Sequence, residues 1–149
     1  MKDHIKVIIG EKHERRGVAF LISDDKNIDA HRFYYGLPEN NTIRRMFNTR
    51  FDNWQEGQPP KNHRYHGWDN SEFNGRYKKC FVFKYQENRL YGFLCNPKDG
   101  KPRYQICVLI VCATKHKKES DETYLKYVEK TREDFTVKRI IKDYFKEKI

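Results

Sequence analysis

The sequence lacks the features that would place a chain in a membrane or on a secretory route. Hydrophobic residues make up only 37% of its 149 residues, and no run approaches the about 20 apolar residues that a membrane-spanning helix needs. The opening MKDHIKVIIGEKHERR has neither the apolar centre nor the small-residue cleavage site of a signal peptide. We therefore expect a cytoplasmic protein that does not contact a membrane.

Motifs for nucleotide and metal chemistry are also missing. There is no Gly-rich phosphate loop, no HExxH and no CxxC pair. The four cysteines lie in apolar stretches and are expected as buried free thiols: Cys80, Cys95, Cys107 and Cys112. We expect no cofactor and no bound metal.

Acidic residues are scarce in the middle of the chain. Residues 76–118 hold 11 Lys and Arg but only two acids, Glu87 and Asp99, whereas Lys and Arg nearly balance Asp and Glu in the flanking segments. Nearly all of the net charge of +10 therefore comes from this middle segment. A concentrated positive charge attracts polyanions, so nucleic acid is the expected partner. A two-metal carboxylate nuclease site has almost no ligands there.

The first half of the chain predicts two strands and one helix. IKVIIG and GVAFLIS are rich in β-branched and apolar residues and predict strands, and residues 27–40 fit no clear pattern. Asn41 or Thr42 can cap a helix that ends near Gly57. Its expected core face is Ile43, Met46, Phe47, Phe51 and Trp54. The prolines that follow predict a loop over 58–70.

The second half predicts an antiparallel meander and two helices. KKCFVFKYQ, RLYGFLC and QICVLIVCA are three strand-like runs separated by short turns. The third run is apolar on both faces and is expected at the centre of the sheet, whereas Lys78 and Lys84 predict that the first exposes one face. Ser120 can cap a following helix, and residues 136–149 form an amphipathic pattern. We expect an α+β fold, with helices packed on a small, twisted, mainly antiparallel sheet.

Basic side chains sit at positions suited to cutting RNA without a metal. The RNA 2′-hydroxyl can attack the adjacent phosphate if groups transfer protons and cations stabilise the added charge. Lys84 precedes the hairpin turn and Arg89 follows it, so the two should lie close together. The third run ends in Lys115, His116, Lys117 and Lys118, with Tyr124 in the next helix. Each of these lysines also fits an ordinary solvated face.

Two other groups of residues carry weaker signals. His63 and His66 lie three apart beside Trp68, a spacing that suggests either a metal pair or a base-stacking surface. Trp68 also fits an anchor of the loop on the core. Arg44, Arg45 and Arg50 on the first helix fit either phosphate contacts or a polar surface.

Taken together, several motifs resemble those of the RelE-like and HigB-like toxins of bacterial toxin–antitoxin pairs, including phage-derived relatives. These are TIRRMFNTRFDNWQEGQPPKNHRYHGW, the hairpin FVFKYQENRLYGFLC, the run QICVLIVCATKHKKES and the helix after it. The resemblance covers about residues 41–135. It implies a single RelE-like domain with a strand extension over 1–40 and a C-terminal helix over 136–149.

The resemblance also implies an activity. Many members cleave mRNA on the ribosome without a metal and are held inactive by an antitoxin protein. By position, Lys84 and Arg89 match the family's basic hairpin residues, and Arg89 is implied as the cation that stabilises the transition state. His116 or a neighbouring lysine matches the basic residue after the central strand, and Tyr124 falls near the helix tyrosine.

The sequence thus supports one leading hypothesis and two alternatives. The first is a metal-independent endoribonuclease with the catalytic residues Lys84, Arg89, His116 and Tyr124. The RNA-binding residues expected with it are Lys78, Lys79, Arg103, Lys115, Lys117 and Lys118. A second is a non-catalytic nucleic-acid-binding or regulatory protein with the same fold. The third is a structural domain whose basic strip is covered by an acidic protein.

Overall fold

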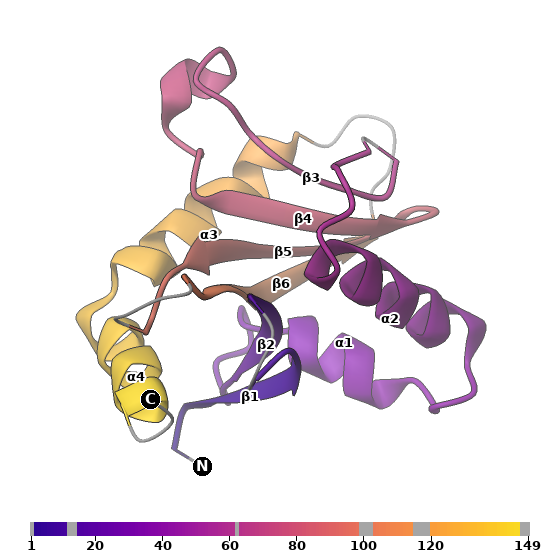
Figure 1. Ribbon diagram of the computed structural model, residues 1–149, viewed down its shortest axis with the longest axis horizontal. Coiled ribbons are helices and arrows are strands. Elements are labelled where there is room, and N and C mark those ends of the chain that lie inside the picture. Colours follow the sequence, from indigo (N-terminus) through magenta and orange to yellow (C-terminus); the bar gives the residue numbers. More distant parts are fainter. Residues whose placement is uncertain (1, 12–14, 62, 99–102, 115–119, 147–149) are drawn as a thin grey trace.

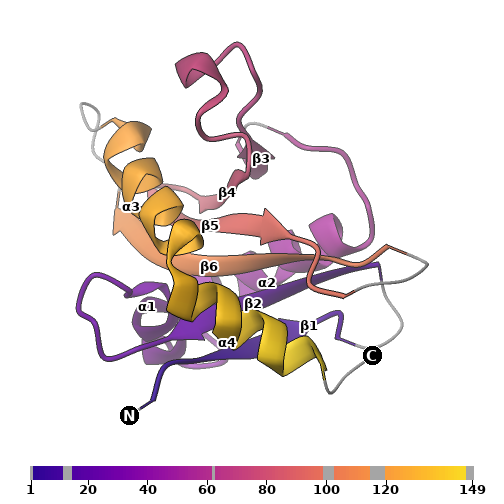
Figure 2. The same cartoon turned by 90° about the vertical axis from the view of Figure 1, so that its left-hand side faces the viewer.

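The structure is a six-stranded sheet between two layers of helices. The computed structural model describes residues 2–11, 15–61, 63–98, 103–114 and 120–146. The strands are β1 (His4–Ile9), β2 (Arg16–Ile22), β3 (Tyr65–Gly67), β4 (Cys80–Tyr85), β5 (Asn88–Cys95) and β6 (Gln105–Thr114). The helices are α1 (Ala30–Gly36), α2 (Thr42–Gln55), α3 (Asp121–Glu133) and α4 (Phe135–Lys146), with a 3-10 turn at Phe73–Gly75. Helices α1 and α2 cover one face of the sheet, and α3 and α4 cover the other (Figures 1 and 2).

The strand order is β1-β2-β6-β5-β4-β3. Strands β4, β5 and β6 form the predicted antiparallel meander, and β6 lies inside the sheet as its two apolar faces indicated. The pairing of β2 with β6 is parallel, with Val18 opposite Cys107, and the other pairs are antiparallel. The expectation of an α+β fold with a mainly antiparallel sheet is confirmed.

Strand β4 differs from its prediction because both of its faces are covered. Phe81 and Phe83 pack on the side of α2, and Cys80 and Val82 pack on the side of α3. Lys84 had suggested a solvent-facing strand. It lies near the end of β4, where a long side chain can reach water past the helix layer.

Strands β1 and β2, from the described part of the first forty residues, are members of the same sheet. Strand β2 has neighbours on both sides and five consecutive buried residues. The segment 27–40, which fitted no pattern, contains α1, a seven-residue helix whose start has no side-chain cap. Strand β3 lies within the expected loop 58–70, where a three-residue strand gives too short a pattern to recognise.

Helices α2 and α3 begin at their predicted caps. The Asn41 side chain accepts hydrogen bonds from the backbone N–H of Ile43 and of Arg44, at 2.8 and 3.2 Å. The Ser120 hydroxyl accepts one from the N–H of Glu122 at 3.1 Å. Helix α2 buries Phe47, Phe51 and Trp54 as expected, whereas Ile43 and Met46 are half-buried.

Helix α4 begins one residue before the predicted start and is described to Lys146. The carboxylate of Asp134 caps it by accepting a hydrogen bond from the N–H of Val137 at 3.1 Å. Val137, Ile141 and Phe145 pack it against the sheet. Within the described ranges, none of the helices has both the length and the apolar composition of a membrane span.

Candidate functional site

The strand register gathers three nitrogen-bearing side chains on the α3 side of the sheet. Lys84 on β4 lies directly opposite Arg89 on β5, as the hairpin spacing predicted. His66 on β3 lies opposite Val82, which shares a strand face with Lys84 because the two are two residues apart. Side chains directly opposite have Cβ atoms about 5 Å apart, and diagonal neighbours are about 7–8 Å apart. His66, Lys84 and Arg89 therefore form one basic cluster near the β4–β5 turn.

The Arg89 side chain is held by the hairpin turn. Its Nη1 donates to the carbonyl oxygen of Gln86 at 2.6 Å and to that of Asn88 at 3.2 Å. Its Nε is buried and has no hydrogen-bond partner among the described residues. Buried donors are usually satisfied, so an unused guanidinium N–H is a feature that a bound anion would explain.

The His66 ring is set up to accept a proton. Its Nδ1 lies 2.8 Å from the carbonyl oxygen of Gly67. A carbonyl can only accept, so Nδ1 carries the hydrogen and Nε2 has the lone pair. Burial lowers the pKa of His66 below its ordinary 6.5, and the charge of Lys84 acts in the same direction, against opposing effects of the Gly67 bond and of nearby carboxylates. The ring is therefore neutral at pH 7.

Aromatic rings pack beside this cluster on the α3 side of the sheet. The rings of Tyr91 and Tyr124 are stacked, with centroids 5.1 Å apart and planes 9° apart. Trp68 stacks on Tyr91 with ring centroids 6.4 Å apart, and the His66 ring meets Trp68 edge-on at 4.8 Å. Trp68 thus anchors its loop on the core, as one interpretation of the sequence proposed. The stack also places Tyr124 on the same side of the sheet as Arg89.

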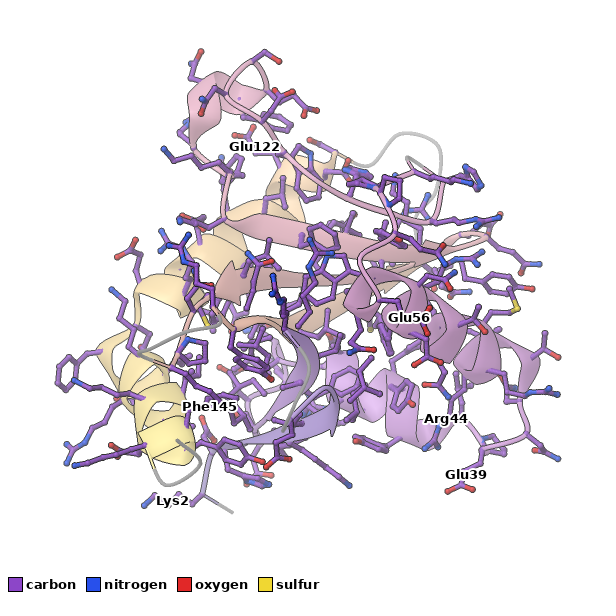
Figure 3. The ribbon with its side chains drawn as sticks, in the orientation of Figure 1. Lys2, Glu39, Arg44, Glu56, Glu122 and Phe145 are labelled. Carbon is purple, nitrogen blue, oxygen red and sulfur yellow. The ribbon has the colours of Figure 1, made fainter. Side chains whose placement is uncertain are left out.

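Carboxylates in the first turn of α3 tie this helix to the sheet. The buried hydroxyl of Tyr91 donates to Oδ1 of Asp121 at 2.6 Å, and that of Tyr77 donates to Oε2 of Glu122 at 2.9 Å. Arg76 adds an ion pair with Glu122 at 3.6 Å. Figure 3 shows Glu122 beside the segment that leads into β4. Burial and the bond to Asp121 raise the pKa of Tyr91, so its hydroxyl keeps its proton.

Some predicted site residues lie outside the described residues. These are Lys115, His116, Lys117 and Lys118. The residues on either side of them are close to the basic cluster. The Thr114 hydroxyl donates to Oδ1 of Asn88 at 3.4 Å, beside Arg89, and Asp121 bonds Tyr91.

Other predicted RNA-binding residues lie at the opposite end of the sheet. The carbonyl oxygen of Lys79 accepts from the N–H of Leu94 at 2.8 Å, near the end of β5, and Arg103 stands just before β6. Lys78 is the exposed neighbour of Lys79. In a meander, the residues before β4 and after β5 meet at one end, and the hairpin turn lies at the other. The described basic residues of segment 76–118 are therefore divided between two ends of the sheet.

Lys79 borders a hollow of about 530 Å³ that also involves α3 and α4. Its other basic residues are Arg132, Lys138 and Lys142, and Phe93 and Ile141 lie at its base. Arg132 is already paired with Glu129 at 2.8 Å and with Glu133 at 2.7 Å. This hollow is therefore less positive than its four basic residues suggest.

Comparison of the chain with protein-family models, curated proteins and solved structures gives no significant match. Among the described residues, no three His, Cys, Asp or Glu side chains converge in a way that could hold a metal ion. His63 and His66 are not part of such a group among the described residues. The sequence singled out His66 only as a weak metal or base-stacking candidate and did not predict Tyr91 or Asp121 as site residues, because only the pairing of β3 with β4 and the docking of α3 bring the three together.

Proposed function

We propose that this protein is a RelE-like, metal-independent endoribonuclease whose scissile phosphate binds between Lys84 and Arg89. The observation that carries the proposal is the basic cluster itself. It combines two cations in register, an unsatisfied buried N–H on Arg89 and a neutral histidine with a lone pair on Nε2.

Each step of the cleavage has a residue type to perform it. Nε2 of His66 takes the proton of the RNA 2′-hydroxyl as its oxygen attacks the phosphorus. Lys84 and Arg89 stabilise the extra negative charge of the phosphorane that forms. The bond to the 5′-oxygen then breaks, and Tyr124 or His116 protonates that leaving oxygen. The products are a 2′,3′-cyclic phosphate and a 5′-hydroxyl.

The order of the elements supports the RelE-like part of the proposal. A hairpin with Lys84 and Arg89 on facing positions is followed by the central strand β6 and then directly by α3, which carries Tyr124. A cytoplasmic location, mRNA as the substrate, cleavage on the ribosome and an antitoxin partner complete the same proposal.

The activity can be tested on end-labelled mRNA in the presence of EDTA, with and without ribosomes. We expect fragments that end in a 2′,3′-cyclic or 3′-phosphate, and we expect Arg89→Ala to lower the cleavage rate by about 100- to 1000-fold. Arg139→Ala is the matched control, since Arg139 is an exposed arginine on α4 paired only with Asp143 among the described residues. Unchanged cleavage by the Arg89 variant would refute the assigned site.

A non-catalytic RNA-binding protein is the second candidate function. The observation that favours it is the bonding of the Arg89 guanidinium to the turn carbonyls, since this geometry also serves to hold the hairpin. Stable RNA binding without cutting, both with and without ribosomes, would support this candidate over the nuclease.

A further inference from the structure

Two arginines meet on the other side of the β4–β5 hairpin. Nε of Arg50, from α2, donates to the carbonyl oxygen of Lys84 at 3.1 Å. The N–H of Lys84 donates to the carbonyl oxygen of Arg64, just before β3, at 2.7 Å. Both residues therefore bond the backbone of Lys84, Arg50 through its side chain and Arg64 through its carbonyl group, and the charge of Arg64 acts on the Arg50 guanidinium. The side chain of Lys84 belongs to the face where Val82 packs, toward α3.

No acid neutralises this pair among the described residues. No carboxylate there forms an ion pair with Arg50 or Arg64, and the charged group that acts most on Arg50 is Arg64. Burial lowers the pKa of Arg50, and the positive charge of Arg64 lowers it further. Placing two like charges together in a half-buried position costs free energy, and an anion between them would remove that cost.

An aromatic ring completes the arrangement. The Arg50 guanidinium lies 5.7 Å from the centroid of the Tyr85 ring, and this ring is half-buried. The third nearby arginine, Arg16, is already engaged, since it donates to the carbonyl oxygen of Trp54 at 2.9 Å and lies over the Trp54 ring. Arg50, Arg64 and Tyr85 thus combine phosphate-binding groups with a ring that a base can stack on.

The hairpin also offers a path from one face of the sheet to the other. Strand β3 pairs with β4 over Phe81–Phe83, and the bond from the Lys84 N–H to the Arg64 carbonyl is the next along this edge, so Tyr85 lies beyond the pairing at the edge of the sheet. A nucleic-acid strand, which has a phosphate at every nucleotide, could place one phosphate at Lys84 and Arg89 and another across this edge, on the side of Arg50 and Arg64. A single RNA strand fits better than an acidic peptide, because every nucleotide carries both a phosphate and a flat base that can stack on a ring.

We propose that Arg50 and Arg64 bind a second phosphate of the same single RNA strand, and that Tyr85 stacks on a base next to it. This inference rests on the proposed function, because it assumes that the substrate is RNA. The arginine pair binds the strand away from the reacting phosphate and so contributes affinity without sequence preference. It is a binding site and takes no part in proton transfer.

Binding to a 2′-O-methyl RNA oligonucleotide, which has no 2′-hydroxyl with which to react, tests the inference directly. For the double variant Arg50→Gln, Arg64→Gln we expect affinity to fall about tenfold or more. The slope of log affinity against log salt should also become shallower by about 0.7 for each phosphate that the variant no longer binds. The control Lys138→Gln, Lys142→Gln removes the same charge from α4 and should leave the slope nearly unchanged.

Two further variants separate binding from folding and from electrostatics. Arg64→Gln alone should retain the fold, because its side chain forms no hydrogen bond with the described residues, and should still weaken binding. Tyr85→Leu should lower the affinity with the salt slope unchanged, since a ring releases no counterions. Thermal melts followed by circular dichroism check that both variants are folded.

The outcomes distinguish this inference from the proposed function. Wild-type affinity and an unchanged slope in the double arginine variant would overturn the arginine site and leave the nuclease proposal standing. Equal reductions in the arginine variant and the α4 control would also overturn it, since only net charge would then matter. If the wild-type protein bound polyglutamate but no RNA, both proposals would fail.

Discussion

His66 shows how one residue acquires a role from its neighbours. In the sequence it is one of six histidines and only a weak metal or base-stacking candidate. Three features of the structure give it a different role: its bond to the Gly67 carbonyl, its partial burial and its position beside Lys84. The first defines which nitrogen is free, and the other two favour the neutral ring. A general base needs both properties.

His66→Gln tests this role through the pH dependence of cleavage. The wild-type rate should fall with decreasing pH only below 6.5, because burial lowers the pKa of His66 and only the neutral ring accepts a proton. The variant should cleave about 100- to 10,000-fold more slowly and lose this acidic limb. Steady-state rates between pH 4.5 and 8 measure it. An acidic limb that persisted in the variant would assign the base to another residue.

The same lowered pKa makes a prediction about stability. A histidine that is neutral in the folded state binds fewer protons than it does unfolded, so stability is lost as the pH falls below 6.5 toward the folded-state pKa. Burial also lowers the pKa of His31. Each single variant, His66→Gln or His31→Gln, should therefore remove only part of the acid destabilisation, measured by urea unfolding at pH 7 and pH 5. If one variant alone removed all of the acid destabilisation, the shared contribution of His66 and His31 would be contradicted.

At the scale of elements, α3 is positioned by polar contacts as well as by packing. Leu125 and Val128 provide the apolar contact. The carboxylates of Asp121 and Glu122 accept hydrogen bonds from the hydroxyls of Tyr91, on β5, and Tyr77, just before β4. The first turn of α3 lies next to the basic cluster. Its exact placement therefore decides where Tyr124 stands relative to Arg89.

Tyr91→Phe tests the importance of this docking. It removes a 2.6 Å hydrogen bond and leaves the Asp121 carboxylate without that donor, which should cost about 1–3 kcal/mol of stability. The stack with Tyr124 keeps its ring, so the change isolates the hydroxyl. Denaturant unfolding gives the stability, and cleavage assays should show a parallel fall in rate. Adding Asp121→Asn should cost less than the sum of the two single variants, because both remove the same bond.

At the scale of the whole molecule, the two helix layers bury both faces of the sheet along the middle of β2, β4, β5 and β6. The layer of α1 and α2 is built mainly from rings, and Phe51 touches several of them: Phe20, Tyr34, Phe47 and Phe83. These contacts hold α2 against β4. Arg50 reaches the hairpin from α2. The core on this side therefore positions the proposed arginine site.

Phe51→Ala should destabilise the protein by about 3–5 kcal/mol, because the side chain is fully buried and leaves a cavity. The control is Phe135→Ala, since Phe135 is 77% exposed at the start of α4 and its removal should change stability by no more than about 0.5 kcal/mol. Urea unfolding of both variants measures the difference. Similar values for the two would contradict the layered core described above.

Local patterns along the chain predicted much of this structure. The caps Asn41 and Ser120, the apolar face of α2 and the β4–β5–β6 meander depend on residues close in sequence, and these predictions are confirmed. The pairing of Lys84 with Arg89 follows from a two-residue turn in the same way. Such features are determined by nearby residues, so the sequence is enough to find them.

Other features depend on contacts between distant parts of the chain. The parallel pairing of β2 with β6, the three-residue strand β3 and the short helix α1 have no local signal strong enough to predict them. By itself the sequence determined the charge, the hairpin and most of the helices. Only the tertiary structure decided that His66 joins Lys84 and Arg89, and that Arg50 meets Arg64, because strand register and helix docking are set by burial of the whole sheet.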